Sequence, residues 1–252
     1  MFCRIVAPMR VLSIVHDEDA GPGVFDDVLS AARADVETWL PARQPGPGAP
    51  ADAYGAILTF GGAAHPHQED RHPWLATEKR FLAEALAARV PMLGVCLGAE
   101  LIAEADGARS QRLPQAEIGW HEVTLTPTGV EDPVLGRIGE SFLALEWHSY
   151  EVALPSRGTE LARGDNCLQA YRIGNLVWGL QFHAEVTPED FQHWLDHYTD
   201  DEDAVALGIE PRAIAEETRG RMAEWNDLGR GICERFLVVA KCARLVRSGV
   251  GH

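Results

Sequence analysis

The sequence predicts an α/β fold in which helices cover both faces of a mainly parallel sheet. Short apolar runs rich in β-branched residues recur in the first hundred residues, as expected for strands buried on both faces. Between them lie longer stretches whose apolar residues recur at helical spacing. Alternating strands and helices favour parallel pairing, because each helix carries the chain back to the start of the next strand.

These elements follow one another in a regular order. The predicted strands are residues 10–15, 54–60 and 91–95. The predicted helices are residues 24–34, 72–90 and 97–105, and Pro91 ends the second of them. Glycine and proline crowd into residues 41–52, which predicts a surface loop before the second strand.

The pattern changes after about residue 117. Residues 117–183 predict shorter strands joined by turns, which would extend the sheet with mixed pairing. Thr187 as N-cap and Pro188 at the first helical position then predict a helix. We therefore expect an α/β domain over residues 1–191 and a helical C-terminal extension over residues 192–252, interrupted by the acidic sequence TDDEDA.

Composition restricts the classes of partner. The chain has 252 residues and a formal net charge of −16, and such a surface repels a phosphate backbone, so we expect no nucleic-acid partner. No apolar run approaches the ~20 residues of a membrane span, so we expect no membrane partner either. The five cysteines are scattered and include no CxxC pair, which favours a reducing cytoplasm. The oligomeric state stays open.

A cysteine stands between a predicted strand and a predicted helix, in the sequence GVCLG. Gly94 and Gly98 flank Cys96 in the G-x-nucleophile-x-G pattern, in which a sharp turn lifts the side chain clear of the strand. Amides at the start of the following helix favour a thiolate at this position. The alternative interpretation is a small, inert thiol packed in a tight turn.

A proton-transfer partner for this cysteine is available in the sequence QFHAEV. A predicted strand ends at His183, and Glu185 can orient its ring because residues i and i+2 of an extended chain point the same way. Active sites of α/β proteins lie at the carboxyl ends of strands, so we expect both side chains near Cys96. The three follow the nucleophile–base–orienter order of a catalytic triad. The alternative is two solvated side chains.

Two glycines directly follow the second predicted strand. Gly61 and Gly62 let the backbone approach a ligand closely. The amide of Gly62 is a candidate oxyanion donor opposite the amide of Leu97, although a Gly-Gly pair alone also fits an ordinary turn.

Two other groups of residues are candidate ligands or nucleophiles. His65, His67 and His72 lie within eight residues and could bind zinc, but we favour a solvated or substrate-proximal loop and expect no metal. Cys167 is interpreted as a packed thiol.

The Gly-Gly strand end, the GVCLG turn and the late HAE sequence, in this order, resemble the class I glutamine amidotransferases. The resemblance extends over EIGWHEVTLTP, LEWHSYEVALP and NCLQAYRIGNLVWGLQFHAEVTPE and covers roughly residues 10–191. These segments are similar to the stand-alone branch that is related to the amidotransferase domain of GMP synthase. The resemblance implies a flavodoxin-like three-layer sandwich and no cofactor.

The resemblance also implies a role for each candidate residue. Cys96 would attack the side-chain amide of glutamine, His183 would carry the proton to the leaving ammonia, and Glu185 would hold His183. The residues expected to border or bind the substrate are Gly61, Gly62, Leu97, Glu100, His148 and Ser149. A separate synthetase subunit would accept the ammonia, because no synthetase domain is evident in the sequence.

One position departs from the family pattern in a way that affects the substrate. The family turn commonly reads C-x-G-x-Q, whereas this chain has Glu100 in place of the glutamine. A carboxylate donates no hydrogen bond unless it is protonated, but it pairs well with an ammonium group. A γ-glutamyl hydrolase or peptidase therefore stays open as an alternative, as does a non-catalytic regulatory subunit built on the same fold.

Overall fold

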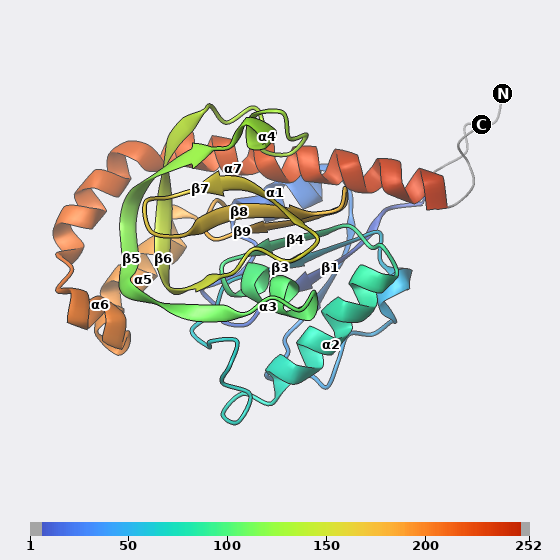
Figure 1. The fold of residues 1–252 in the computed structure, drawn as a ribbon, viewed down its shortest axis with the longest axis horizontal. Coiled ribbons are helices and arrows are strands. Elements are labelled where there is room, and N and C mark those ends of the chain that lie inside the picture. The colour runs from blue at the N-terminus through green and yellow to red at the C-terminus, as the bar shows by residue number, and fades with distance from the viewer. Residues whose placement is uncertain (1–6, 248–252) are drawn as a thin grey trace.

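The computed structural model describes residues 7–247 and confirms the predicted fold class (Figure 1). One mixed sheet has the strand order β2-β1-β3-β4-β9-β8-β7-β5-β6. The strands are β1 (Arg10–Ile14), β2 (Asp35–Trp39), β3 (Ala56–Thr59), β4 (Met92–Val95), β5 (Ser110–Leu125), β6 (Ser141–Val152), β7 (Gly158–Arg163), β8 (Leu168–Ile173) and β9 (Val177–Leu180). Pairing is parallel from β2 to β9 and antiparallel from β9 to β6.

Helices cover both faces of this sheet. The helices are α1 (Val24–Ala31), α2 (Trp74–Ala87), α3 (Leu97–Ala105), α4 (Pro127–Val130), α5 (Pro188–Asp196), α6 (Glu202–Leu207) and α7 (Pro211–Arg247), with short 3₁₀ turns η1 (Ala51–Ala53) and η2 (Tyr198–Asp200). In Figure 1, α7 runs along the sheet beside α1, whereas α2 and α3 lie on the other side.

The core has two parts, one on each face of the sheet, because successive strand residues point to opposite faces. In β3, Leu58 packs into the cluster that contains residues of α1 and α7. Its neighbour Ile57 packs into the cluster that contains residues of α2 and α3. The inner parallel strands β3 and β4 are therefore buried along their whole length, which explains their continuous apolar runs in the sequence.

The structure departs from the predicted elements in two places. Strand β2 was not predicted, because its sequence DVETW mixes charged and apolar residues, as suits an edge strand with an exposed face. The strands after residue 110 include two that are longer than expected, since β5 has 16 residues and β6 has 12. These two pair as a long ribbon with a bulge between Arg112 and Glu117, and they curve around one end of the sheet in Figure 1.

The predicted helix start at Thr187 is confirmed. The Thr187 side chain accepts from the amide of Asp190, and the Asp190 side chain accepts from the amide of Thr187, which forms a capping box. The predicted domain boundary at residue 191 falls inside α5, and Trp225 and Phe236 of α7 belong to the same buried cluster as the sheet. The two-part division stays a prediction. Within the described residues, no helix is long and apolar enough to cross a membrane.

Candidate active site

The turn between β4 and α3 holds Cys96 in a strained backbone conformation. Cys96 has φ +50° and ψ −117° and is the N-cap of α3. A Cβ atom added at Gly94 would lie 2.7 Å from the amide nitrogen of Ala99, and one at Gly98 would lie 2.2 Å from the carbonyl oxygen of Thr59. Both flanking positions therefore require glycine, as the sequence pattern predicts.

Parallel pairing of β4 with β9 brings the second half of the site to this turn. The amide of Cys96 donates to the carbonyl oxygen of Leu180, the last residue of β9, at 2.7 Å. The chain then continues from Leu180 to His183 and Glu185, so their position relative to Cys96 follows from the register of two adjacent strands.

His183 is buried and held from several sides. Its Nδ1 lies 2.9 Å from Oε1 of Glu185, and both side chains are almost fully buried. The Trp194 ring meets the His183 ring edge-on at 4.9 Å, and the indole N–H of Trp225 donates to the carbonyl oxygen of His183 at 2.8 Å. Sequence patterns had indicated neither tryptophan as part of the site, because both belong to the C-terminal helices.

The charge state of His183 follows from its neighbours. Burial alone lowers the pKa of His183, but the charges of Glu185 and of a Cys96 thiolate outweigh burial and raise that pKa to about 10. The ring therefore carries a proton at neutral pH whenever the Cys96 sulfur is charged.

The backbone of the Gly61–Gly62 turn lies beside the side chains of Cys96 and His183. Gly61 lies against both, because a Cβ atom added there would lie 3.0 Å from Cε1 of His183 and 3.7 Å from Cβ of Cys96. Gly62 and Leu97 line the same cleft, and within the described residues neither amide N–H has a hydrogen-bond acceptor.

Glu100 lies one turn into α3, on the wall of the cleft. It is 3% exposed, and Nε2 of Gln181 donates to its Oε1 at 3.2 Å. Burial raises the pKa of Glu100 to about 7, although the hydrogen bond from Gln181 lowers it by stabilising the charged form. Near neutral pH the side chain is therefore divided between a charged form and a neutral form that can donate a hydrogen bond.

The cleft is large and is bordered by most of the predicted residues. Its volume is about 870 Å³, and its lining includes Cys96, His183, Glu100, His148 and Ser149. His65 and His72 also line it, but the three loop histidines form no metal-binding group within the described residues. The interpretation of that segment as a loop near the pocket agrees with its place in the structure.

Behind the cleft, two buried glutamates of the β5–β6 ribbon flank His148. Its Nε2 lies 3.1 Å from Oε2 of Glu117 and 3.2 Å from Oε2 of Glu146. Its Nδ1 donates to the carbonyl oxygen of Tyr150 at 2.8 Å. Burial lowers the pKa of His148, but the two carboxylates raise it well above the ordinary value, so the ring is an imidazolium.

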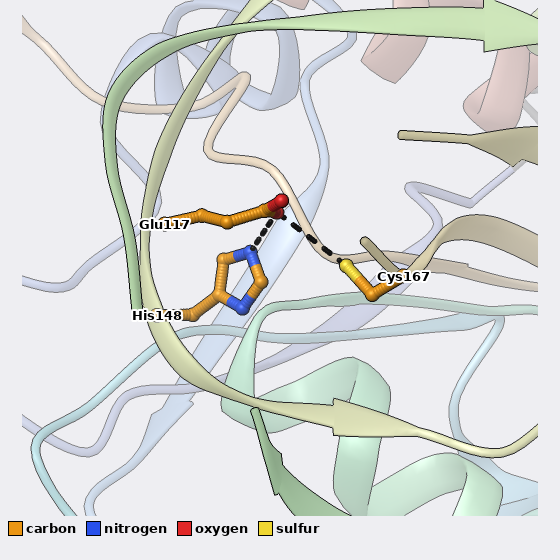
Figure 2. A group of neighbouring side chains, drawn as sticks. All are labelled: Glu117, His148 and Cys167. Atoms are coloured by element: carbon orange, nitrogen blue, oxygen red, sulfur yellow. Dashed lines mark hydrogen bonds and ion pairs between the residues drawn. The ribbon is translucent and has the colours of Figure 1, made fainter. Parts of the chain in front are cut away.

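Figure 2 shows His148 with Glu117 and Cys167, whose ligand-type atoms lie within 4.8 Å of one another. That spacing could admit a metal ion, yet hydrogen bonds already occupy the Glu117 carboxylate. Its donors are Asn166, Gln169 and the Cys167 thiol, at 2.7, 2.9 and 3.4 Å. Burial and the charge of Glu117 raise the pKa of Cys167, which keeps it a neutral thiol and agrees with its interpretation as a packed residue.

The partners of Glu100 and His148 were missed at the sequence level. Glu146 stands two residues before His148 in β6, a spacing that places both side chains on one face of the strand. Glu117 lies opposite His148 in the antiparallel register, and only that register brings it to the histidine. Gln181 is 81 positions from Glu100 in the chain, so no local spacing connects them. The signal in the sequence was that Glu100, Glu117 and Glu146 stand in a helix or in strands, each between two apolar neighbours.

Comparisons with known proteins identify the family of this chain. A sequence model of the family Glutamine amidotransferase class-I matches residues 34–198. The chain belongs to the class-I glutamine amidotransferase family. The chain is 30% identical to the glutamine amidotransferase-like protein YfeJ of Salmonella typhimurium, over 86% of this chain and 91% of that protein. A solved glutamine amidotransferase from Thermotoga maritima is 25% identical, with a TM-score of 0.82 over 92% of this chain and 99% of that one.

Two further relatives of this family member differ in activity. A gamma-glutamyl-L-1-hydroxyisopropylamide hydrolase from a Pseudomonas species is 30% identical over 66% of this chain, which spans 60% of that hydrolase. A glutamine-hydrolysing GMP synthase component from Sulfolobus acidocaldarius is 35% identical over 38% of this chain, which spans 52% of that protein.

Proposed function

We propose that this amidotransferase-family protein hydrolyses the side-chain amide of glutamine through Cys96, His183 and Glu185. The observation that carries the proposal is the strained turn at Cys96 beside a buried His183 that pairs with Glu185. A nucleophile, a proton carrier and an orienting carboxylate are the three parts that acyl transfer through cysteine requires.

The proposed reaction proceeds through a thioester. The Cys96 thiolate attacks the amide carbon, and the amides of Gly62 and Leu97 stabilise the oxyanion of the tetrahedral intermediate. The His183 imidazolium gives its proton to the leaving nitrogen, the C–N bond breaks, and ammonia departs from a glutamyl thioester. His183 then takes a proton from water, which attacks the thioester carbon, and the C–S bond breaks to release glutamate. The ammonia would pass to a separate synthetase subunit.

A second candidate is hydrolysis of a γ-glutamyl amine, with the same residues and water as the final acceptor. Glu100 in place of glutamine favours it, as does the similarity to the Pseudomonas hydrolase. Besides Glu100, seven acidic residues line the cleft: Asp17, Glu18, Asp19, Asp200, Asp201, Glu202 and Asp203. Such a lining attracts a leaving amine that carries a second, positive charge.

A non-catalytic regulatory role is the remaining alternative. The presence of Cys96, His183 and Glu185 together disfavours it, since a silent site does not need a thiol in a strained turn.

One experiment separates these functions. The purified chain is assayed for ammonia and glutamate release from glutamine, and for amine release from γ-glutamyl derivatives of a neutral amine and of a diamine. Cys96→Ala should lower turnover at least ~10⁴-fold, whereas Cys242→Ala, which removes an exposed thiol, should leave it unchanged. Turnover of γ-glutamyl amines alone would favour the second candidate. No turnover of any substrate, with no labelling of Cys96 by a glutamine-mimicking electrophile, would favour the regulatory role.

A further inference from the structure

A second buried histidine–glutamate pair lies beside the Gly61–Gly62 turn. His16 closely follows β1, and its Nε2 lies 2.7 Å from Oε2 of Glu78 in α2. Both side chains are at most 1% exposed, and the hydroxyl of Thr59 donates to Oε1 of Glu78 at 2.9 Å. The pair has no part in the reaction proposed above, although it is more deeply buried than most of the cleft lining.

The other nitrogen of His16 faces the backbone of the turn. Nδ1 lies 2.9 Å from the carbonyl oxygen of Gly61 and 3.0 Å from that of Phe60. Carbonyl oxygens only accept, so Nδ1 must carry a hydrogen, and Nε2 shares another with Glu78. Burial lowers the pKa of His16, but the charge of Glu78 raises it above the ordinary value. The Trp74 ring, stacked on the imidazole at 5.1 Å, also suits a cation.

This contact determines the direction of one amide. The described chain contains no cis peptide bond, and in a trans peptide the C=O and N–H groups point in opposite directions. Because His16 holds the carbonyl of Gly61, the N–H of Gly62 points away from His16. The next amide, that of Ala63, already donates to Oδ2 of Asp17 at 2.8 Å. The N–H of Gly62, by contrast, has no acceptor within the described residues, so it is available to an oxyanion.

We propose that His16 and Glu78 are a positioning pair, which orients the Gly61–Gly62 peptide so that the Gly62 amide faces the oxyanion. This inference rests on the proposed function, because it concerns the oxyanion donor of that reaction. Two consecutive glycines have wide conformational freedom, so their own sequence does not determine this orientation. A buried ion pair seldom adds to stability, so stability alone does not explain the His16–Glu78 pair. The contact of His16 with the Gly61 carbonyl oxygen assigns the pair a role in orienting the turn.

Two variants of His16 separate positioning from structural support. His16→Gln places an amide N–H near the position of Nε2, so the variant side chain can donate to Glu78 but not to the Gly61 carbonyl oxygen. His16→Asn combined with Glu78→Gln places a donor near the position of Nδ1 and leaves no buried charge unpaired. For His16→Gln, kcat should fall at least ~10-fold, towards the 10²–10³-fold loss of an oxyanion donor, with KM little changed. The double variant should keep kcat at least ~10-fold above that of His16→Gln.

Alkylation of Cys96 by iodoacetamide provides the control. This displacement forms no oxyanion, so its rate should stay within about twofold of the native rate in both variants. The proposal is overturned if both variants lose kcat equally, or if alkylation slows in step with kcat, because the pair would then support the fold only.

Crystal structures of the native protein and of His16→Gln test the orientation without turnover. A rotated Gly61–Gly62 peptide in the variant supports the proposal, and an unchanged peptide overturns it. If the native protein hydrolyses neither glutamine nor a γ-glutamyl amine, the proposed function fails, and these two structures still decide whether His16 orients the peptide.

Discussion

Replacement of Glu100 by glutamine should stabilise the protein in a pH-dependent way. The side chain is buried, and its pKa is about 7 in the folded protein against an ordinary value of 4.5. The folded state thus binds the proton more tightly than the unfolded state does, and the native protein loses stability as pH rises from 4.5 to 7. Glu100→Gln has no proton to lose, so its advantage grows over the same interval.

The size of the effect follows from the two pKa values. A difference of about 2.5 pKa units corresponds to about 3 kcal/mol at pH 8, where both states are ionised, and to about 1 kcal/mol at pH 5. Urea unfolding of native protein and Glu100→Gln at both pH values measures the change. The matched control is Glu84→Gln, since Glu84 is an exposed residue of α2. A stability difference that is equal at pH 5 and pH 8 would refute the reasoning.

The same substitution tests the substrate contact. Protonated Glu100 can donate a hydrogen bond as glutamine does, and this donor disappears as pH rises through 7. We therefore expect kcat/KM of the native protein for glutamine to decline above pH 7, with a smaller decline in Glu100→Gln. For a γ-glutamyl diamine the order should reverse, because the charged form attracts an ammonium group.

Two further predictions concern the proposed triad and the turn at Cys96. Glu185→Gln should lower the pKa of His183 from about 10 towards its ordinary value and reduce kcat by about 10²- to 10⁴-fold. NMR titration of the imidazole measures the pKa, and turnover assays measure kcat. An unchanged imidazole pKa would contradict the pairing of His183 with Glu185. Gly98→Ala should destabilise the fold by about 1–3 kcal/mol in urea unfolding, because its methyl group would meet the carbonyl oxygen of Thr59. Gly220→Ala, in an open and exposed part of α7, should instead stabilise by about 0.5–1 kcal/mol, and equal effects of the two would argue against the clash.

For Glu78, the sequence pattern could predict burial but not the partner of the carboxylate. It shares one face of α2 with the buried Leu75 and Leu82, at spacings of three and four residues, so an acid on an apolar stripe was visible in the sequence. Its partner was not visible, because His16 lies 62 positions away and meets Glu78 only when α2 packs on the sheet. The long ribbon of β5 and β6 was likewise underestimated, since its alternation is broken by the bulge before Glu117.

The sequence by itself determined the fold class and the turn that presents Cys96. Both depend on short-range physics: the alternation of apolar runs selects the sheet and its helices, and Gly94 and Gly98 permit a turn that other residues would block. The tertiary structure alone decided the charge states of Glu100 and His148. A pKa depends on burial and on neighbouring groups, and here these include Gln181 beside Glu100 and Glu117 beside His148, which are distant in the chain and meet their partners only through the pairing of the sheet.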